Sequence, residues 1–289
     1  MRVPLGVTVL AVLAVLTTDG LTLAGRAVAA VPHPAGPAHA GAPERAPAGD
    51  GLAQAIAHRD YWRKTRQKLL ADDFGETAHY RKANAELPPP SDREPRVVFL
   101  GDSIFEGWYL PEPFPGKDYV GRGIGGQTTS QVLVRFRQDV VELRPAAVVI
   151  LLGTNDLAGN TGPITLPDIQ RNFASLVDLA RARGIAVVLS SVLPVHDYTK
   201  ASKLQFPLRP PAQIQALNNW LKTYCHDQGL VYLDFFSAMV DGAGLMKKEL
   251  AEDGLHPNRA GYAIMAPLAA EAIKRALANH GASAVAGAR

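Results

Sequence analysis

The sequence predicts an α/β fold in which helices cover both faces of a parallel sheet. Between residues 96 and 276, short apolar runs alternate with longer segments in which apolar residues recur every three or four positions. The short runs are typical of strands buried on both faces, and the longer segments are typical of helices with one buried face. Strands and helices that alternate in this way indicate a parallel sheet. The 289 residues, of which 47% are hydrophobic, suffice for one substantial core.

Five segments are expected to form the strands. Most of them are dominated by apolar side chains with no helical spacing, and the segment at 146–152 contains no polar residue at all. The expected strands cover residues 96–101, 118–120, 146–152, 185–191 and 230–234.

Helices are expected between these strands and after the last one. Pro167 suits the first turn of the second helix, and Gly184 closes that helix. The apolar faces of the expected helices lie within 132–143, 169–180, 214–225 and 262–276, and a further helix is expected over residues 241–252.

The first 50 residues differ in composition from the rest of the chain. Residues 1–29 combine Arg2, an apolar stretch and the small-residue pattern Ala27-Val28-Ala29, which is typical of a secretory signal peptide cleaved near Ala29 or Ala30. The alternative is that this segment is retained as a membrane anchor. Residues 30–50 are rich in Ala, Pro and Gly and predict a disordered linker. We therefore expect a secreted or cell-envelope protein with no stable membrane span after cleavage.

The rest of the chain divides into three parts. Residues 51–90 have a helix-compatible pattern that ends at a run of three prolines, which predicts a helical N-terminal extension. Residues 91–280 form the expected main domain, and residues 281–289 are expected to be a flexible tail.

Charge and cysteine content restrict the classes of partner. The 30 Lys and Arg residues nearly balance the 27 Asp and Glu residues, so we expect neither nucleic acid nor a membrane surface as a partner. The single cysteine, Cys225, lies on the apolar face of an expected helix, which predicts a buried, unreactive thiol. With no H-E-x-x-H motif and one cysteine, the sequence predicts no metal site, and we expect no cofactor.

Polar and glycine-rich blocks follow several of the expected strands. They are Gly101-Asp102-Ser103, the glycine cluster 121–126, Gly153-Thr154-Asn155-Asp156 and Asp253-Gly254-Leu255-His256. Because the carboxyl ends of parallel strands meet at one edge of a sheet, these blocks are expected to lie close together.

These residue types suit acyl transfer. Ser103 is a candidate nucleophile, and His256 with Asp253 could supply the base and the carboxylate that orients it. Asn155 offers a side-chain N–H and Gly126 a backbone N–H, and both suit an oxygen on which negative charge develops.

Each block also has an interpretation in which it takes no part in catalysis. Gly-Asp-Ser and Asn155 are common in turns, Asp253 could cap the last helix, and His256 could be a solvated loop residue. The glycines 121–126 match G-x-G-x-x-G, the dinucleotide fingerprint, but the acidic residue expected about 20 positions later is missing. A further alternative is a non-catalytic secreted binding module on the same fold, against which the intact serine, histidine and aspartate argue.

Taken in order, the four blocks resemble those of the SGNH (GDSL) hydrolase family, and most closely its bacterial lysophospholipase-like and platelet-activating-factor-acetylhydrolase-like branch. The resemblance spans residues 95–278. It implies a flavodoxin-like three-layer α/β/α sandwich with a five-stranded parallel sheet. It also implies a Ser103–His256–Asp253 triad, with an oxyanion hole formed by the Ser103 N–H, Gly126 and Asn155.

Substrate contacts are expected from the loops at 104–116 and 194–211, which are rich in apolar and aromatic residues. The candidate substrate-binding residues are Asp102, Ile104, Trp108, Tyr198 and Leu255. Such loops would suit acyl chains or a sugar ring, so lipid esters, short-chain esters and acetylated polysaccharides are all candidate substrates.

Overall fold

The structure, a computed structural model, describes residues 51–287, and side-chain surroundings are described up to residue 280. The expected signal peptide and linker therefore lie outside the described residues. The chain divides into two units, 1–42 and 43–289, and everything described below belongs to the second. In the described part of the chain, none of the helices is both long and apolar enough to span a bilayer.

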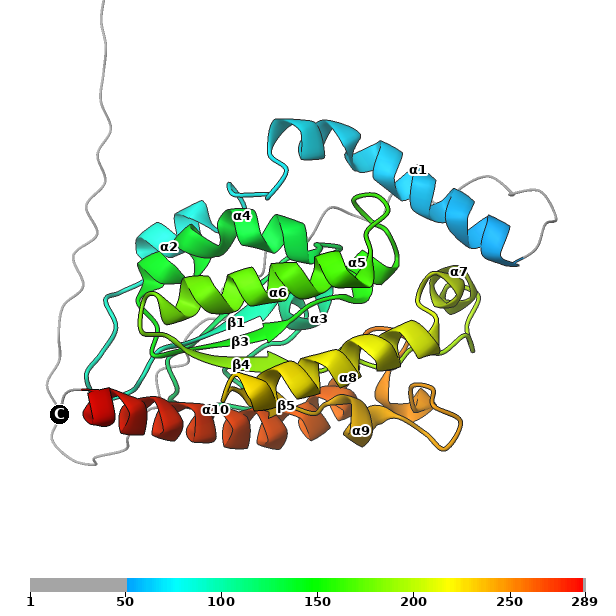
Figure 1. Cartoon of the computed structure of the whole chain (residues 1–289). Coiled ribbons are helices and arrows are strands. Elements are labelled where there is room, and N and C mark those ends of the chain that lie inside the picture. The colour runs from blue at the N-terminus through cyan, green and yellow to red at the C-terminus, as the bar shows by residue number, and fades with distance from the viewer. Residues whose placement is uncertain (1–50, 288–289) are drawn as a thin grey trace, which may run out of the picture. The chain divides into compact units, whose positions relative to one another are not determined.

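Five parallel strands form the central sheet, as the sequence predicts (Figure 1). Their order is β2-β1-β3-β4-β5, which is the flavodoxin-like order of doubly wound folds. The strands are β1 (Val97–Gly101), β2 (Tyr119–Gly123), β3 (Ala147–Leu151), β4 (Ala186–Ser190) and β5 (Val231–Leu233).

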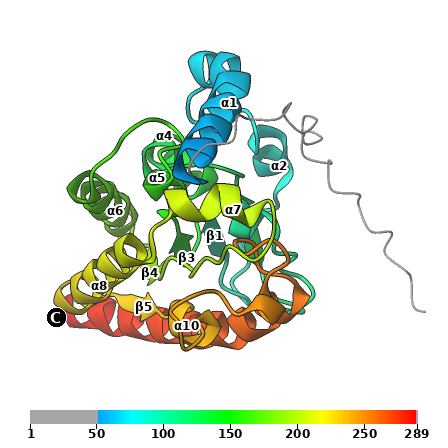
Figure 2. The same ribbon diagram turned by 90° about the vertical axis from the view of Figure 1, so that its right-hand side faces the viewer.

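Helices cover both faces of this sheet, so the three-layer architecture is confirmed (Figures 1 and 2). One face carries α4 (Thr129–Asp139), α6 (Leu166–Arg181) and α8 (Pro211–Asp227). The opposite face carries α3 (Ser103–Glu106), α9 (Phe236–Met239) and α10 (Arg259–Gly287). The remaining elements are α1 (Gly51–Asp72), α2 (Arg81–Glu86), η1 (Val141–Leu143), α5 (Thr154–Leu157), α7 (Ser202–Gln205), η2 (Phe206–Leu208) and η3 (Lys248–Leu250).

The alternation of side chains along β1 explains why this strand is apolar throughout. Val98 and Leu100 pack into the core beneath α4, α6 and α8, whereas Val97 and Phe99 pack into the core beneath α10. All four are completely buried. A strand in the middle of a sheet that is covered on both faces has no solvent-facing side, so no polar residue is tolerated along it. The first polar side chains can appear only where the strand ends, at Asp102 and Ser103.

The N-terminal extension forms two helices, α1 and α2, where the sequence predicts one helical region. Helix α1 packs against α7 and η2, and Figure 2 shows α1 and α7 side by side. Ala55 is the one residue of α1 that is fully enclosed, in a small cluster with Ala158 and Leu208. The extension is thus attached to the loops that follow the strands.

Three expectations about element boundaries are wrong. The helix expected over 241–252 is a turn followed by η3, because Asp241 accepts hydrogen bonds from the backbone of Ala243 and Leu245 and Gly244 adopts a φ of 81°. Strand β2 continues to Gly123, three residues further than expected. Helix α10 continues to Gly287, well beyond the apolar face expected to end at residue 276, while the flexibility expected of residues 281–289 stays a prediction.

Candidate active site

Ser103 lies at the carboxyl end of β1, as the first residue of α3. The preceding residue, Asp102, caps this short helix through a 3.0 Å hydrogen bond that its Oδ1 accepts from the Ile104 N–H. At Gly101, a Cβ would come within 2.7 Å of the Leu151 carbonyl oxygen, so the exit from the strand has no room for a side chain. The strand and the cap together fix the backbone of Ser103.

A chain of two hydrogen bonds links Ser103, His256 and Asp253. The Nδ1 of His256 lies 2.6 Å from Oδ2 of Asp253, and its Nε2 lies 2.9 Å from Oγ of Ser103. Because a carboxylate can only accept, Nδ1 carries the proton of the neutral imidazole, and Nε2 is left as an acceptor for the Ser103 hydroxyl. The three residues that the sequence singled out therefore meet at the carboxyl edge of the sheet.

Asp253 is held in its ionised form. Partial burial alone would raise the pKa of this carboxyl, but its hydrogen bond to His256, the nearby imidazole charge and two backbone N–H donors together hold its pKa far below the ordinary range. A carboxylate in this position stabilises an imidazolium ion formed on His256.

The loop that carries Asp253 and His256 is fastened by Tyr198. The Tyr198 hydroxyl accepts a 3.0 Å hydrogen bond from the Gly254 N–H and donates to the Ala251 carbonyl. Gly254 has a φ of 79°, and a Cβ there would come within 2.3 Å of the His196 carbonyl oxygen. These contacts give Tyr198 a role in holding the loop, whereas the sequence suggests a substrate contact for it.

Asn155 contacts the residue before Ser103, and Gly126 follows Gly125, at which a Cβ would lie 3.8 Å from the Ser103 Cβ. The Asn155 Nδ2 donates to the Asp102 Oδ2 at 3.3 Å and to the Gln127 carbonyl at 3.1 Å. Gly126 has a φ of 79°, and its carbonyl accepts a 2.9 Å hydrogen bond from the side chain of Asn160. The Asn155 amide and the Gly126 carbonyl are thus both hydrogen-bonded to neighbouring groups of the protein.

Asp102 carries an unusual protonation equilibrium. Its side chain is completely buried, and burial raises the pKa of this carboxyl to about 7. The hydrogen bond from the Ile104 N–H and the charges of His256 and Arg209 act in the opposite direction and lower the pKa, but burial has the larger effect. The group therefore titrates near neutrality, within reach of the Asn155 amide.

Two residues that the sequence did not single out lie against Gly126 and Asn155. The ring of Trp62, from α1, covers Gly126 so closely that a Cβ there would come within 2.6 Å of it. The buried guanidinium of Arg209 donates to both Thr154 and Asn155. Neither residue lies in a motif, and no local signal in the sequence marks them.

Most of the candidate substrate-binding residues are buried. Asp102, Ile104 and Leu255 are enclosed in the protein, and a substrate contact stays a prediction for them. Trp108 is buried as well: its ring stacks on Tyr262 and packs edge-on against Phe99. Its indole Nε1 has no hydrogen-bond partner among the described residues, and a substrate contact stays a prediction for it too.

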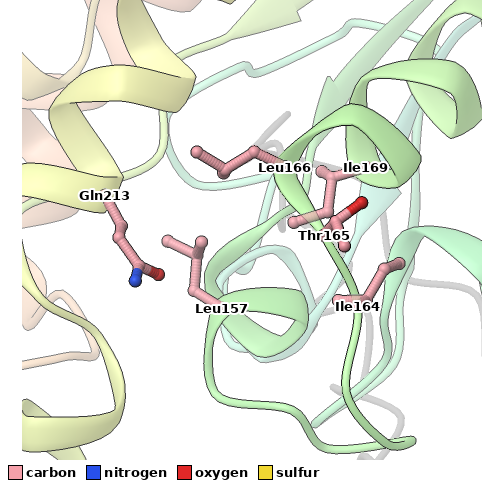
Figure 3. A pocket seen from close by; sticks show the side chains of 6 residues that line it. All are labelled: Leu157, Ile164, Thr165, Leu166, Ile169 and Gln213. Atoms are coloured by element: carbon pink, nitrogen blue, oxygen red, sulfur yellow. The ribbon is translucent and has the colours of Figure 1, made fainter.

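Two surface hollows lie outside the Ser103 region. One of about 260 Å³ lies between α5, α6 and α8, and Figure 3 shows the six side chains that line it. Another of about 390 Å³ is bounded by residues of α1, most of them polar, together with Asn160 and Thr161. Neither is lined by Ser103, Asp253 or His256, so we do not take either as the reaction site.

The glycine-rich segment has a structural role that differs from phosphate binding. Gly121 and Gly123 lie inside β2, where they pair with Phe99 and Gly101 of β1. A dinucleotide fingerprint needs its glycines in the turn after the strand, so this context contradicts that alternative. Among the described residues, no group of histidine, cysteine, aspartate and glutamate is arranged to hold a metal ion.

Comparison with solved structures shows the same fold in several bacterial proteins. A putative acylhydrolase from Bacteroides fragilis matches with 41% identity and a TM-score of 0.66, over 71% of this chain and 99% of that one. A GDSL-like lipase from Bacteroides thetaiotaomicron matches with 39% identity and a TM-score of 0.65, over 70% of this chain and 99% of that one.

Curated sequences give weaker and shorter matches. The esterase TesA of Pseudomonas aeruginosa is 31% identical over 49% of this chain and 63% of its own length. An uncharacterized lipoprotein of Bacillus subtilis is 32% identical over 27% of this chain and 33% of its own length. This chain thus spans one third to two thirds of the length of these two relatives.

The profile of the GDSL-like lipase/acylhydrolase family matches residues 99–264. This segment contains Ser103, Gly126, Asn155, Asp253 and His256, and it extends over most of the sheet and its helices. With the strand order, the geometry at Ser103 and this match in agreement, the chain belongs to the GDSL-like lipase/acylhydrolase family.

Proposed function

We propose that the protein is a serine ester hydrolase that works through an acyl-enzyme. The observation that carries this proposal is the continuous chain from the Ser103 hydroxyl through His256 to the ionised Asp253. A serine hydroxyl is a weak nucleophile unless a base takes its proton as it attacks. Here the base is in hydrogen-bonding contact, and the carboxylate behind it sets its tautomer.

The first half of the reaction forms the acyl-enzyme. The Ser103 Oγ attacks the ester carbonyl carbon while its proton passes to Nε2 of His256, and the carbonyl π electrons move onto the oxygen. When the tetrahedral intermediate collapses, the bond to the alcohol oxygen breaks, and the imidazolium returns its proton to that oxygen. The second half repeats these steps with water, which releases the carboxylic acid and regenerates the Ser103 hydroxyl.

The negative oxygen of both intermediates needs donors. The Ser103 N–H, the Gly126 N–H and the Asn155 Nδ2 are the proposed oxyanion hole. The fixed surroundings of Gly126 and Asn155 support this assignment, because donors held in place before the reaction require little reorganisation in the transition state. No cofactor enters these steps.

The proposed substrates are esters of small molecules, lipids or polysaccharides, with no nucleic acid involved. The relatives named esterase and acylhydrolase support this class. Secretion or attachment to the cell envelope is part of the proposal and rests on the signal-like residues 1–29. A non-catalytic binding module would have no need for the hydrogen-bonded serine, histidine and carboxylate.

The test is turnover of p-nitrophenyl esters from acetate to palmitate by the wild type and by Ser103→Ala. A fluorophosphonate probe should label Ser103 and no other serine, and the substitution should abolish both labelling and turnover. Turnover that survives in the folded Ser103→Ala protein would contradict the proposal. Absence of turnover in the wild type on all chain lengths, together with absence of labelling, would favour the binding module.

A further inference from the structure

Arg209 is a buried cation beside the candidate oxyanion hole, and it belongs to none of the sequence motifs. It follows η2 in the loop between β4 and α8 and is only 3% exposed. Its four hydrogen bonds go to uncharged oxygen atoms, on Thr154, Asn155 and Gln205. Burying a guanidinium without a directly bonded carboxylate is costly, so the position calls for a functional reason.

The guanidinium fixes the orientation of the Asn155 amide. The Oδ1 of Asn155 accepts a 3.2 Å hydrogen bond from Arg209 Nη2 and a 3.1 Å hydrogen bond from Asn160 Nδ2. If the amide were turned over, its own N–H groups would face two donors and both bonds would be lost. The Nδ2 is therefore directed toward the Gln127 carbonyl and toward Asp102, the residue before Ser103.

The same contact makes Asn155 a stronger donor. A cation that donates to the amide oxygen draws electron density away from the amide nitrogen and polarises its N–H bonds. Burial lowers the pKa of Arg209 to about 10, partly offset by the charges of Asp102 and Asp253, so the group is still protonated at neutral pH.

We propose that Arg209 is a positioning residue of the oxyanion hole, which holds and polarises the Asn155 amide for the developing negative charge. This inference rests on the proposed ester hydrolase function. The alternative is that Arg209 only fastens its loop, for which its two hydrogen bonds to Gln205 would suffice.

A double-mutant cycle separates these two roles. Removing an oxyanion donor costs about 10²–10³ in kcat, and losing the residue that orients the donor should cost part of that, about tenfold or more, with little change in KM. Arg209→Met keeps an unbranched side chain of the length of the arginine stem and removes the charged guanidinium. In an Asn155→Ala background the same substitution should have almost no further effect, because the amide on which Arg209 acts is gone.

Two further variants guard against loss of folding. Arg209→Lys keeps the charge but not the planar fork, and it should retain more of kcat than Arg209→Met. Gln205→Ala removes a contact of the same guanidinium on the loop side and should leave kcat unchanged. Equal losses from Arg209→Met in the presence and absence of Asn155, or a loss confined to KM, would overturn the proposal.

A readout without turnover keeps the inference separate from the proposed function. The side-chain amide resonances of Asn155, identified by their disappearance in Asn155→Ala, should shift in Arg209→Met and stay in place in Gln205→Ala. If they stay in place in Arg209→Met, the positioning role is wrong even in an active enzyme. If they shift while the wild type hydrolyses no ester, the orientation holds and the proposed reaction is what fails.

Discussion

The side-chain amide of Asn155 donates to the buried carboxyl of Asp102 across 3.3 Å. The proposed oxyanion donor is thus engaged by a titratable group one residue before the nucleophile. Burial raises the pKa of Asp102 to about 7. When Asp102 is protonated, the site holds one negative charge fewer at the place where an oxyanion has to form.

Asp102→Asn should change how stability depends on pH. The pKa of Asp102 is about 7 in the folded protein and 3.8 by reference, so the folded state binds its proton more tightly than the unfolded state does. Its contribution to stability is therefore complete below the unfolded pKa and is lost as pH rises through about 7. Denaturant unfolding at pH 5 and pH 8 should show that the wild type loses more free energy of unfolding between these two pH values than Asp102→Asn does. Parallel changes in both proteins would refute the raised pKa.

Asp253→Asn should lower kcat by up to about 10⁴, because the neutral amide no longer fixes the His256 tautomer or stabilises the imidazolium. In the wild type, kcat/KM should fall in acid, because a general base accepts the Ser103 proton only in its unprotonated form. Asp253 cannot cause that fall, since its pKa is held far below the ordinary range. Rates measured from pH 5 to 9 provide the check, with Asp102→Asn as the control for the second titrating group. A flat wild-type profile would remove His256 as the base.

Asn155→Ala should lower kcat by roughly 10²–10³ and leave KM nearly unchanged, because the donated hydrogen bond becomes strong only when charge reaches the substrate oxygen. As a turn residue, Asn155 would instead contribute to stability without affecting turnover per folded molecule. Kinetics on a short-chain ester, with the melting temperature measured alongside, distinguish the two. A folded variant with near-normal kcat would take Asn155 out of the site.

Gly126→Ala should lower the free energy of unfolding by more than backbone strain alone would. A Cβ at Gly126 would meet the Trp62 ring at 2.6 Å, and φ there is 79°. Gly116 is a matched control, because its φ is 76° and a Cβ would have nothing within 4 Å. Gly116→Ala should lose only the roughly 1–2 kcal/mol of a left-handed non-glycine residue. Gly126→Ala should lose more stability and most of its turnover, and adding Trp62→Ala should recover part of the stability. Equal losses of stability in Gly126→Ala and Gly116→Ala would show that the Trp62 ring does not clash with a Cβ at residue 126.

The sheet and the grouping of polar residues around Ser103 could be predicted from the sequence, for a definite physical reason. In a parallel sheet each buried strand must be apolar until it ends, so the first polar residues after β1 and β3 mark the same edge. Ser103 and Asn155 follow directly from that rule. Asp253 and His256 could be paired because they are three positions apart and meet through local backbone geometry.

Arg209 and Trp62 could not be found in this way. Arg209 reaches Asn155 from 54 positions further along the chain, and its placement depends on how the loop before α8 returns over α5. The position of Trp62 depends on how α1 packs. The sequence of α1 does not determine this packing, since Ala55 is its one fully enclosed residue. The burial of Trp108 could not be foreseen for a related reason: aromatic residues after a strand can point into the core as readily as into a cleft.

Helix α1 lies outside the segment that the family profile matches, yet it contacts Gly126 within that segment. The family profile begins at residue 99, yet the ring that covers Gly126 comes from residue 62, and the ion pair between Arg66 and Glu76 joins α1 to the segment that follows it. A unit cut at the border of the profile would retain Ser103 and lose the ring that lies against Gly126. An exchange of segments between relatives that is to keep this contact would accordingly have to transfer α1 together with residues 99–264.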